Sequence, residues 1–340
     1  MLYIKELPKR EKLSKDYSLT EAEEQSRASR IREIQKVLSG EDDRKILIIG
    51  PCSADRQDSV LDYVIRLKGI EKRISDKFIV IPRIYTSKPR TTGEGYKGIL
   101  HNPDADEQED LLRGLYASRM LHLSVIRETG LFAADEMLYP EEMYYISDLL
   151  CYMAVGARSV EDQGHRMLAS DDSLPVGLKN PTGGSKISLL QSVRAAQKGH
   201  RMIYRGWEVE TLGNPYAHAI LRGFINKSGR NYQNYHYEDI VELHDMMYTN
   251  NLSNVSVIID CNHSNSDKKY EEQVRIAKEV FGFFRENEDV RSFVKGLMIE
   301  SYIEDGSQIP GQGIYGKSIT DPCLGWKKTE KLLYELYEMI

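Results

Sequence analysis

The apolar run ILIIG (residues 46–50) opens the pattern that decides the fold. Seven further short runs, rich in apolar and β-branched residues, follow it along the chain: FIVIPRI (78–84), LFAADEM (131–137), MAVGAR (153–158), LPVGLKN (174–180), AILRG (219–223), VSVIID (255–260) and GLMIES (296–301). Continuous apolar runs, rather than alternating ones, are typical of strands that are buried on both faces of a parallel sheet. Longer amphipathic stretches separate the runs and predict helices.

Eight strands, each followed by a helix, predict an α/β fold of the (β/α)8 TIM-barrel kind, for which about 250–300 residues is the right size. The alternative is a doubly wound open sheet. Helix signals between the runs include Pro140 with two acids after it, Gly130 just past a helix end, and a charged amphipathic segment at 267–287. A ninth apolar segment, HRMIYRGWEVET, lies between the fifth and sixth units and predicts an inserted β-hairpin near residues 200–216.

Residues 1–44 precede the first strand and predict an N-terminal helical extension to a catalytic barrel at 45–340. Within the extension, residues 18–39 are expected to be helical, with Ser18 and Glu21 as the start signal and Gly40 just past the end. The segment is polar with sparse apolar positions, so we expect it to pack on the barrel or on another subunit.

The composition excludes several classes of protein. The 46 Lys and Arg residues and 52 Asp and Glu residues give a net charge of −6, which argues against a general nucleic-acid binder. No apolar run approaches the roughly 18 residues of a membrane span. The opening MLYIKELPKREKLSKDY carries charges where a signal peptide would be apolar, and four cysteines in 340 residues are no disulfide framework. We therefore expect a cytoplasmic protein with reduced thiols.

In a parallel barrel the active site forms at the carboxyl ends of the strands. The residues that end or follow the eight runs are chemically unusual, because nearly all are charged or able to bind a metal: Cys52, Arg83, Glu136, Arg158, Lys179, Arg222, Asp260 with His263, and Glu300. Charges that merely solvate a surface would scatter over both ends of the strands. This clustering predicts a functional site at one mouth of the barrel.

One group of these residues is cationic within an acidic protein: Arg83, Lys88, Arg90, Arg158, Lys179 and Arg222. Arginine forks bind phosphate and carboxylate with two hydrogen bonds, and lysine adds a point charge. Cations that converge on one mouth repel each other unless an anionic ligand is present, so at least one phosphorylated small-molecule substrate is expected. The glycine clusters PTGG (181–184) and GQGIYG (311–316) are either phosphate-binding turns or ordinary ones.

The second group is Cys52, His263, Glu300 and Asp321. One thiolate, one imidazole and two carboxylates make a mixed site for one divalent transition metal ion, and the cysteine and histidine favour Mn, Fe, Co or Zn over Mg or Ca. No familiar ligand spacing supports this site. Its support is that three of the residues follow strands one, seven and eight, which are neighbours in a closed barrel.

With these residues assembled, the chain resembles the type I 3-deoxy-D-arabino-heptulosonate 7-phosphate (DAHP) synthases of bacteria and fungi. The matching motifs run in the family's order over nearly all of the chain after residue 40: GPCSADR (50–56), PRIYTSKPRTTGEGYKG (82–98), AADEML (133–138), VGARSVEDQGHR (155–166), PVGLKN (175–180), ILRG (220–223), DCNHSN (260–265), ES (300–301) and YGKSITDPCLGW (315–326). Two departures, CNHSN for the family's FSHAN and KNPTGG for its KNGTDG, leave His263 and Lys179 in place.

The resemblance implies a transferase, 3-deoxy-7-phosphoheptulonate synthase, with four metal ligands: Cys52, His263, Glu300 and Asp321. It implies a phosphoenolpyruvate site made of Arg83, Lys88, Glu136, Ala157, Arg158, Lys179 and Arg222. It places the phosphate of erythrose 4-phosphate against Arg90 and Thr91, with Lys88 and Pro89 beside the sugar chain. Lys88 is the candidate general acid, with Cys52 and His263 in the catalytic group, and the reaction is the first step of the shikimate pathway to aromatic amino acids.

Three alternatives stay open. The related eight-carbon keto-sugar phosphate synthase would take arabinose 5-phosphate, but its loop carries an Asn-Arg-Ser-Ser pattern where this chain has Lys-Pro-Arg-Thr-Thr. A class II metal aldolase would lack the set of cations and would carry a histidine triad. A non-catalytic barrel protein would not be expected to keep every candidate ligand.

The resemblance also bears on regulation and assembly. In the family, parts that match residues 1–44 and the 200–216 hairpin build subunit contacts and an inhibitor pocket for an aromatic amino acid. Leu168 and Ser173 match pocket positions, whereas Met143-Tyr144 stands where inhibitor-sensitive relatives have Pro-Gln. We expect a homodimer or homotetramer, with feedback inhibition by phenylalanine or tyrosine.

Overall fold

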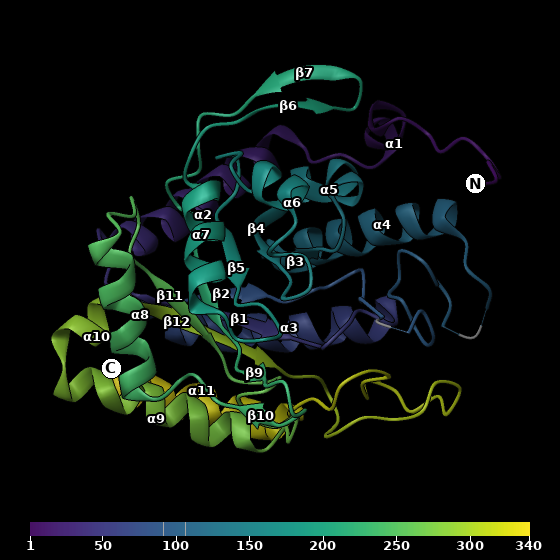
Figure 1. The fold of residues 1–340 in the computed structure, drawn as a ribbon. Helices are drawn as coiled ribbons and strands as arrows, with labels where there is room; N and C mark the ends of the chain where they lie inside the picture. Colours follow the sequence, from purple (N-terminus) through teal and green to yellow (C-terminus); the bar gives the residue numbers. More distant parts are fainter. Residues whose placement is uncertain (91, 106) are drawn as a thin grey trace.

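A parallel sheet of eight strands forms the body of the molecule (Figure 1). The computed structural model describes residues 1–340 apart from residues 91 and 106. The sheet has the order β2-β1-β12-β11-β8-β5-β4-β3, and every pairing within it is parallel. Its strands are β1 (Lys45–Gly50), β2 (Phe78–Pro82), β3 (Ala133–Met137), β4 (Leu150–Val155), β5 (Val176–Lys179), β8 (His218–Leu221), β11 (Val257–Asp260) and β12 (Val294–Glu300).

The sheet closes into a barrel between its two terminal strands. Arg83, directly after β2, forms a parallel bridge with Ala134 of β3, and the amide of Ile84 donates to the Ala134 carbonyl at 3.0 Å. Every residue of the eight strands is buried, as the continuous apolar runs predicted. The predicted barrel is therefore confirmed, and the open sheet was the wrong alternative.

Helices follow each of the eight strands and cover the outside of the barrel (Figure 1). They are α3 (Gln57–Ile74), α4 (Leu111–Thr129), α5 (Pro140–Ile146) with the 3-10 turn η1 (Ser147–Leu149), α6 (Gln163–Leu168), α7 (Lys186–Ala196), α8 (Tyr237–Thr249), α9 (Glu272–Glu286) with α10 (Glu288–Phe293), and α11 (Trp326–Met339). Pro140 opens α5 and Gly130 ends α4, as expected. The helix predicted from residue 267 is wrong at its start, because a series of turns precedes α9.

Two helices, α1 (Arg10–Asp16) and α2 (Glu21–Ser39), precede the barrel. The predicted Ser18 cap is wrong: Thr20 caps α2 through a reciprocal pair of hydrogen bonds with Glu23, and Gly40 ends the helix in a left-handed conformation. Helix α2 packs on β4 and β1, where the Arg27 guanidinium donates to the Leu150 carbonyl at 2.6 Å. The extension therefore lies against the amino-terminal side of the barrel.

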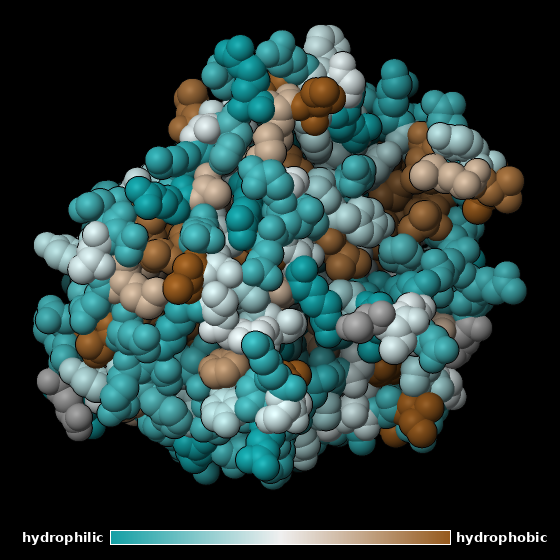
Figure 2. Space-filling view, in the orientation of Figure 1, coloured by the Kyte–Doolittle hydropathy of each residue, from teal (hydrophilic) through white to brown (hydrophobic). Residues whose placement is uncertain are grey.

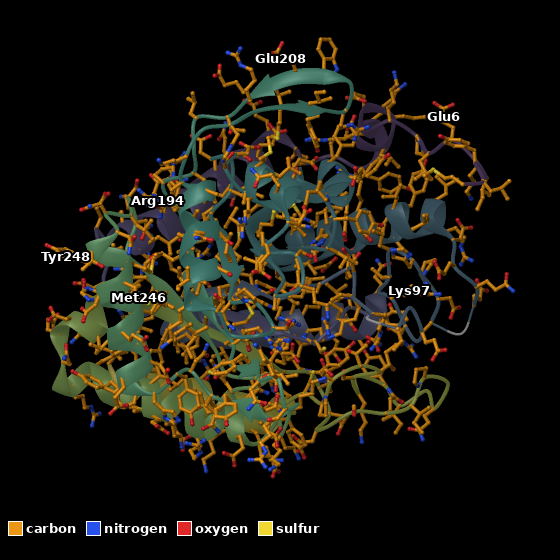
Figure 3. The ribbon with its side chains drawn as sticks, viewed as in Figure 1. Glu6, Lys97, Arg194, Glu208, Met246 and Tyr248 are labelled. Atoms are coloured by element: carbon orange, nitrogen blue, oxygen red, sulfur yellow. The ribbon has the colours of Figure 1, made fainter. Side chains whose placement is uncertain are left out.

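An antiparallel hairpin of β6 (Arg201–Tyr204) and β7 (Trp207–Glu210) stands apart from the barrel at the top of Figure 1. Its outer edge faces solvent, and Glu208 points away from the body in Figure 3. Ile203 and Trp207 are exposed on the same element, and Figure 2 shows brown atoms at the corresponding top edge of a mostly hydrophilic face. The predicted inserted hairpin is thus present.

Another antiparallel hairpin, formed by β9 (Phe224–Ile225) and β10 (Asn231–Tyr232), follows β8. No pattern in the sequence predicted this short hairpin. Within the described residues, no helix combines the length and the apolar character that a membrane span requires.

Gly50, the last residue of β1, allows two neighbouring strands to come very close together. A Cβ atom at this position would lie 2.3 Å from the carbonyl oxygen of Arg83, so only glycine allows β1 and the end of β2 to approach this closely. That approach brings the residues after the two strands, Cys52 and Arg83, to the same mouth of the barrel.

Candidate active site

A cavity of about 240 Å³ opens at the carboxyl ends of the barrel strands. Twelve of the residues that the sequence singled out line it: Cys52, Arg83, Lys88, Pro89, Arg90, Glu136, Ala157, Arg158, Lys179, Arg222, His263 and Asp321. Glu300 is fully buried beside it. Thr91 lies outside the described residues.

Three of the four candidate metal ligands converge at one side of this cavity. Ligand atoms of Cys52, Glu300 and Asp321 all lie within 4.8 Å of one another. Cys52 follows β1, Glu300 ends β12, and Asp321 lies in the loop after β12, so the pairing of β1 with β12 brings them together. The side chain of Gln273 in α9 holds the backbone of Glu300 with two hydrogen bonds, of 2.8 and 2.9 Å.

The fourth candidate, His263, lies next to this group without joining it. Its Nε2 is 3.6 Å from Oε1 of Glu300, and its Nδ1 is 2.9 Å from Oδ2 of Asp260. Asp260 is fully buried, and neither its Oδ2 nor Nδ1 of His263 has a hydrogen-bond partner among the described residues, so their contact is an ion-pair distance only. With Nδ1 turned toward Asp260, Nε2 is the nitrogen that faces the carboxylate group.

Lys88 supplies positive charge between these ligands. Its Nζ lies 2.6 Å from Sγ of Cys52 and 3.0 Å from Oδ2 of Asp321. Burial opposes the charge on Lys88, but Cys52 and Asp321 raise its pKa above the ordinary value. Burial, reinforced by Glu300, raises the pKa of the Cys52 thiol to about 11, so ionisation of Cys52 requires a nearby cation.

Opposite charges compensate the buried cations deeper in the cavity. Lys179 pairs with Glu136 at 3.0 Å, and Arg83 pairs with Glu300 at 2.9 Å. Burial opposes ionisation of Glu136, but Lys179 holds the pKa of that carboxyl below its usual range. The ring of Tyr85 lies 3.7 Å from the Arg83 guanidinium and 5.3 Å from the Lys179 ammonium, which adds a cation–π contact to each.

Arg222, a cation in the cavity, keeps a donor that no described protein group uses. The guanidinium of Arg222 is more than nine-tenths buried, and its Nη1 has no hydrogen-bond partner in the described structure. Arg158 also lines the cavity and is exposed. Burial is the main cause of the lowered pKa of Arg222, and the nearby positive charge of Arg158 lowers it further. A buried donor without a partner is costly, so this end of the cavity suits an anion.

Residues of the two glycine clusters line different cavities. Thr182 of PTGG lines the cavity, and a turn hydrogen bond joins Gly184 to Pro181 at 2.9 Å. Gly311 and Gly313 of the second cluster line a different cavity, which also contains Asp55 and Arg56. The second cluster therefore takes no part in this site.

Sequence reasoning missed several residues of the site, including Tyr85, Asn262, Gln273 and Lys268. Lys268 lines the cavity and its Nζ lies 2.8 Å from Oδ1 of Asp321. Nothing in the sequence separates it from Lys269, which follows it directly. Asn262 could have been found as the neighbour of His263; its side-chain amide donates to Oε2 of Glu300.

The donor set fits a divalent transition metal ion. A thiol and two carboxylates are buried together, a histidine nitrogen faces them, and an ammonium group already satisfies part of their demand for positive charge. Sulfur and nitrogen donors among oxygen donors are typical of Mn, Fe, Co or Zn rather than Mg or Ca.

The profile of the DAHP synthetase I family matches residues 20–334 of this chain. The chain belongs to this family. The match covers all of α2 and all eight barrel strands, and it ends within α11.

Similar curated proteins in the DAHP synthetase I family are named as one enzyme with different inhibitors. The Tyr-sensitive phospho-2-dehydro-3-deoxyheptonate aldolase of Escherichia coli K12 is 36% identical over 337 residues, covering 96% of this chain and 91% of its own length. The Trp-sensitive enzyme of Enterobacter agglomerans is 37% identical over 317 residues, covering 91% of this chain and 88% of its own. A tyrosine-inhibited enzyme of Candida albicans is 36% identical over 317 residues, with 90% and 83% covered.

The solved structure of phospho-2-dehydro-3-deoxyheptonate aldolase from Francisella tularensis SCHU S4 superimposes with a TM-score of 0.92. It is 30% identical in sequence and covers 100% of this chain and 98% of its own. The barrel of this family member therefore follows that of a solved enzyme over its full length.

Proposed function

We propose that this DAHP synthetase I family member condenses phosphoenolpyruvate with D-erythrose 4-phosphate in a metal-dependent reaction. The products are 3-deoxy-D-arabino-heptulosonate 7-phosphate and phosphate, and the reaction is the first step of aromatic amino acid biosynthesis. Membership of the family supports the reaction, and the names of the relatives support the same activity.

The observation that carries the proposal is the division of one cavity into two chemical halves. One half holds Cys52, Glu300 and Asp321 together, and the other holds Arg158 and Arg222 with an unpaired buried donor. Two phosphorylated substrates need several cations, whereas activating an aldehyde needs a Lewis acid. A simple metal aldolase would not need the second half.

We assign each of these cations to one of the two substrates. Arg158, Lys179 and Arg222 would hold the phosphate and carboxylate of phosphoenolpyruvate and stabilise the charge that develops as phosphate leaves. Arg90 would hold the phosphate of the aldose; its Nε donates to the Tyr96 carbonyl at 2.8 Å, which orients the guanidinium in the loop after β2. Glu136 keeps Lys179 in place.

In the reaction, carbon 3 of phosphoenolpyruvate attacks the aldehyde carbon, and the aldehyde oxygen gains a proton. Water then adds at carbon 2, and the C–O bond to phosphate breaks, leaving a ketone. A divalent metal held by Cys52, His263, Glu300 and Asp321 would supply Lewis-acid polarisation of the aldehyde oxygen. Lys88 is the proposed general acid because its ammonium lies beside both Cys52 and Asp321, where that oxygen would be held.

A phosphate-release assay tests the proposal. The protein should release phosphate from phosphoenolpyruvate with erythrose 4-phosphate and not with arabinose 5-phosphate, and a chelator should stop the release until Mn, Fe, Co or Zn is returned. Preference for arabinose 5-phosphate would instead assign the eight-carbon synthase. Turnover of neither aldose, with intact substrate binding, would indicate a non-catalytic protein.

Regulation by an aromatic amino acid is a further part of the proposal, supported by the inhibitor sensitivities in the names of the relatives. A cavity of about 490 Å³ lies between α5, α6 and the β6–β7 hairpin, and Tyr145, Leu168 and Arg205 are among its lining residues. Tyr144 is turned away from it: its hydroxyl donates to Glu11 at 3.0 Å, and Arg205 covers its ring. Tyr144 therefore leaves this cavity open.

Titration of activity with phenylalanine, tyrosine and tryptophan at sub-saturating substrate tests this part. Inhibition by phenylalanine or tyrosine is expected, and no inhibition by any of the three at millimolar concentration would contradict it. The proposed homodimer or homotetramer rests on the exposed apolar side chains of Ile203 and Trp207 and of residues 1–4. A monomer by light scattering would contradict the assembly.

A further inference from the structure

The loop between β11 and α9 carries unusual backbone conformations. His263, Asp267 and Lys268 have positive φ angles of 52°, 55° and 57°. None of them is glycine, and Asp267 and Lys268 are consecutive. A positive φ is unfavourable for lysine and better tolerated by aspartate and histidine, so contacts from the surrounding structure help to hold Lys268 in this turn.

Several hydrogen bonds hold it, and two of them bear on the position of Lys268. The amide of Lys268 donates to the His263 carbonyl at 2.9 Å, and the side chain of Asn231 donates to Oδ1 of Asp267. The first bond is local. The second comes from the β9–β10 hairpin, a separate element that the barrel does not need for closure.

The β9–β10 hairpin is itself rigidly anchored. The amide of Ile225 donates to the Thr182 carbonyl at 2.9 Å, and the rings of Phe224 and Tyr232 stack with centroids 5.3 Å apart. Phe224 also lies against Gly184, where a Cβ atom would come within 2.3 Å of the ring. Ile225 and Asn231 line the active-site cavity. The hairpin thus ties the loop after β5 to the loop after β11.

The strained turn places one side chain on a candidate metal ligand. Nζ of Lys268 lies 2.8 Å from Oδ1 of Asp321, on the side of the carboxylate away from Lys88. The other oxygen, Oδ2, lies 3.5 Å from Sγ of Cys52. The Lys268 side chain is 58% exposed, but it pairs with Oδ1 and leaves Oδ2 as the oxygen of Asp321 that faces the ligand group.

We propose that the β9–β10 hairpin is a positioning element for Asp321, acting through the contact of Asn231 with Asp267 and the ion pair of Lys268 with Asp321. This inference rests on the proposed metal-dependent function. Partners that orient a ligand from outside the coordination sphere commonly change metal affinity 10- to 100-fold when they are removed. A lysine that merely formed an exposed ion pair would change it little.

Titration of the metal-free protein with Co²⁺ tests the proposal, read from the thiolate-to-cobalt absorption band that Cys52 would give. Lys268→Met should weaken Co²⁺ binding by about tenfold. Asn231→Ala should weaken it in the same direction by a smaller factor. The double variant should be no weaker than Lys268→Met, because Asn231 acts only through Lys268. Lys227→Met, which removes an exposed lysine at the tip of the same hairpin, is the matched control and should bind Co²⁺ like wild type.

A second pair of variants separates the turn from general stability. Asp267→Ala removes the acceptor for Asn231 and keeps the strain, whereas Asp267→Gly removes the acceptor and relieves the strain. Co²⁺ affinity should fall more in Asp267→Ala than in Asp267→Gly. Thermal unfolding of each metal-free variant shows that the barrel is folded.

Several outcomes would overturn the proposal. Unchanged or tighter Co²⁺ binding in folded Lys268→Met would show that Lys268 does not orient Asp321, and additive effects of Asn231→Ala and Lys268→Met would show that the hairpin does not act through it. Phosphate release, assayed on the same wild-type sample, distinguishes these failures from failure of the proposed function. A wild-type protein that releases phosphate without a cobalt–thiolate band would contradict the metal site and the positioning role together.

Discussion

Both ends of the barrel bury lysine side chains, and Lys179 at one end is held differently from Lys45 at the other. At the carboxyl end, Lys179 lies 3.0 Å from Glu136 and 3.9 Å from Asp260. At the amino end, Lys45 opens β1 and donates to the carbonyl oxygens of Arg291 and Val294. Burial, with Lys295 as the next cause, lowers the pKa of Lys45 to about 7.

The comparison shows which buried charges serve the site. Carboxylates at the mouth keep the cations charged and oriented, so that an anionic substrate meets a prepared set of donors. Carbonyl dipoles at the base only partly compensate the charge on Lys45, because burial still favours its neutral form. We therefore expect variants at the mouth to change activity without unfolding the barrel. A variant at the amino end should change stability and leave activity unchanged.

The largest effect is expected from Cys52→Ala. Activity and metal binding should both be lost while the fold stays intact, because the barrel core does not depend on an ion. Activity assays, metal analysis and thermal unfolding measure the three properties. Cys151→Ala is the matched control, since Cys151 is another buried cysteine and lies in β4, away from the cavity. Retained activity at saturating metal would remove Cys52 from the site.

A reversible loss of activity is expected on oxidation without metal. The amide of Cys52 donates to Sγ of Cys323 at 3.3 Å, so the two thiols are neighbours and we expect a Cys52–Cys323 disulfide to form in air. Activity should return with reductant and metal. Peptide mapping after oxidation checks the bond, and two free thiols would contradict it.

Variants of the cations should separate the two substrates. Arg158→Ala or Lys179→Ala should mainly raise the KM for phosphoenolpyruvate, and Arg90→Ala should mainly raise the KM for erythrose 4-phosphate. Loss of a charge-assisted contact costs about 1.5–3 kcal/mol, or roughly ten- to hundredfold. Steady-state kinetics with each substrate varied measure this. A change only in the phosphoenolpyruvate KM of Arg90→Ala would reverse the assignment.

The smallest effect on activity is expected at the amino end of the barrel, where Lys45 affects stability instead. Between pH 7 and 10, unfolded Lys45 binds a proton that the folded protein has released, so unfolding free energy should rise with pH by at most about 1.4 kcal/mol per unit. Lys45→Met should reduce this rise, because only the smaller contribution of Lys295 would remain, and should leave kcat unchanged. Denaturant unfolding at several pH values tests it, with Lys227→Met as the exposed control. Parallel curves for wild type and Lys45→Met would contradict the lowered pKa.

The fold was predictable because its signals are local. Each buried strand appears as a continuous apolar run, and Pro140, Gly130 and Gly40 mark helix ends by their own backbone preferences. The cap of α2 was misplaced by two residues because Ser18 and Thr20 offer the same chemistry, and only the hydrogen bonds of Thr20 with Glu23 decide between them.

The residues that form the site could be predicted from the sequence, but the contacts between them could not. The ends of parallel strands meet at one mouth, so the cations and candidate ligands could be collected from the sequence, although Cys52 and Asp321 are far apart along the chain. Their mutual distances depend on side-chain directions. Lys88 between Cys52 and Asp321, and His263 turned toward Asp260, follow from packing that no spacing encodes.

The sequence by itself determined the barrel, the family and the chemical type of the mouth, because strand periodicity, motif order and residue type are properties of the chain. Only the tertiary structure decided that Lys268 rather than Lys269 reaches Asp321, and that the β9–β10 hairpin holds the turn between them. The physical reason is that a side chain's partner depends on backbone angles and on neighbours from distant segments. In Asp267 and Lys268 those angles are positive φ values that non-glycine residues seldom adopt.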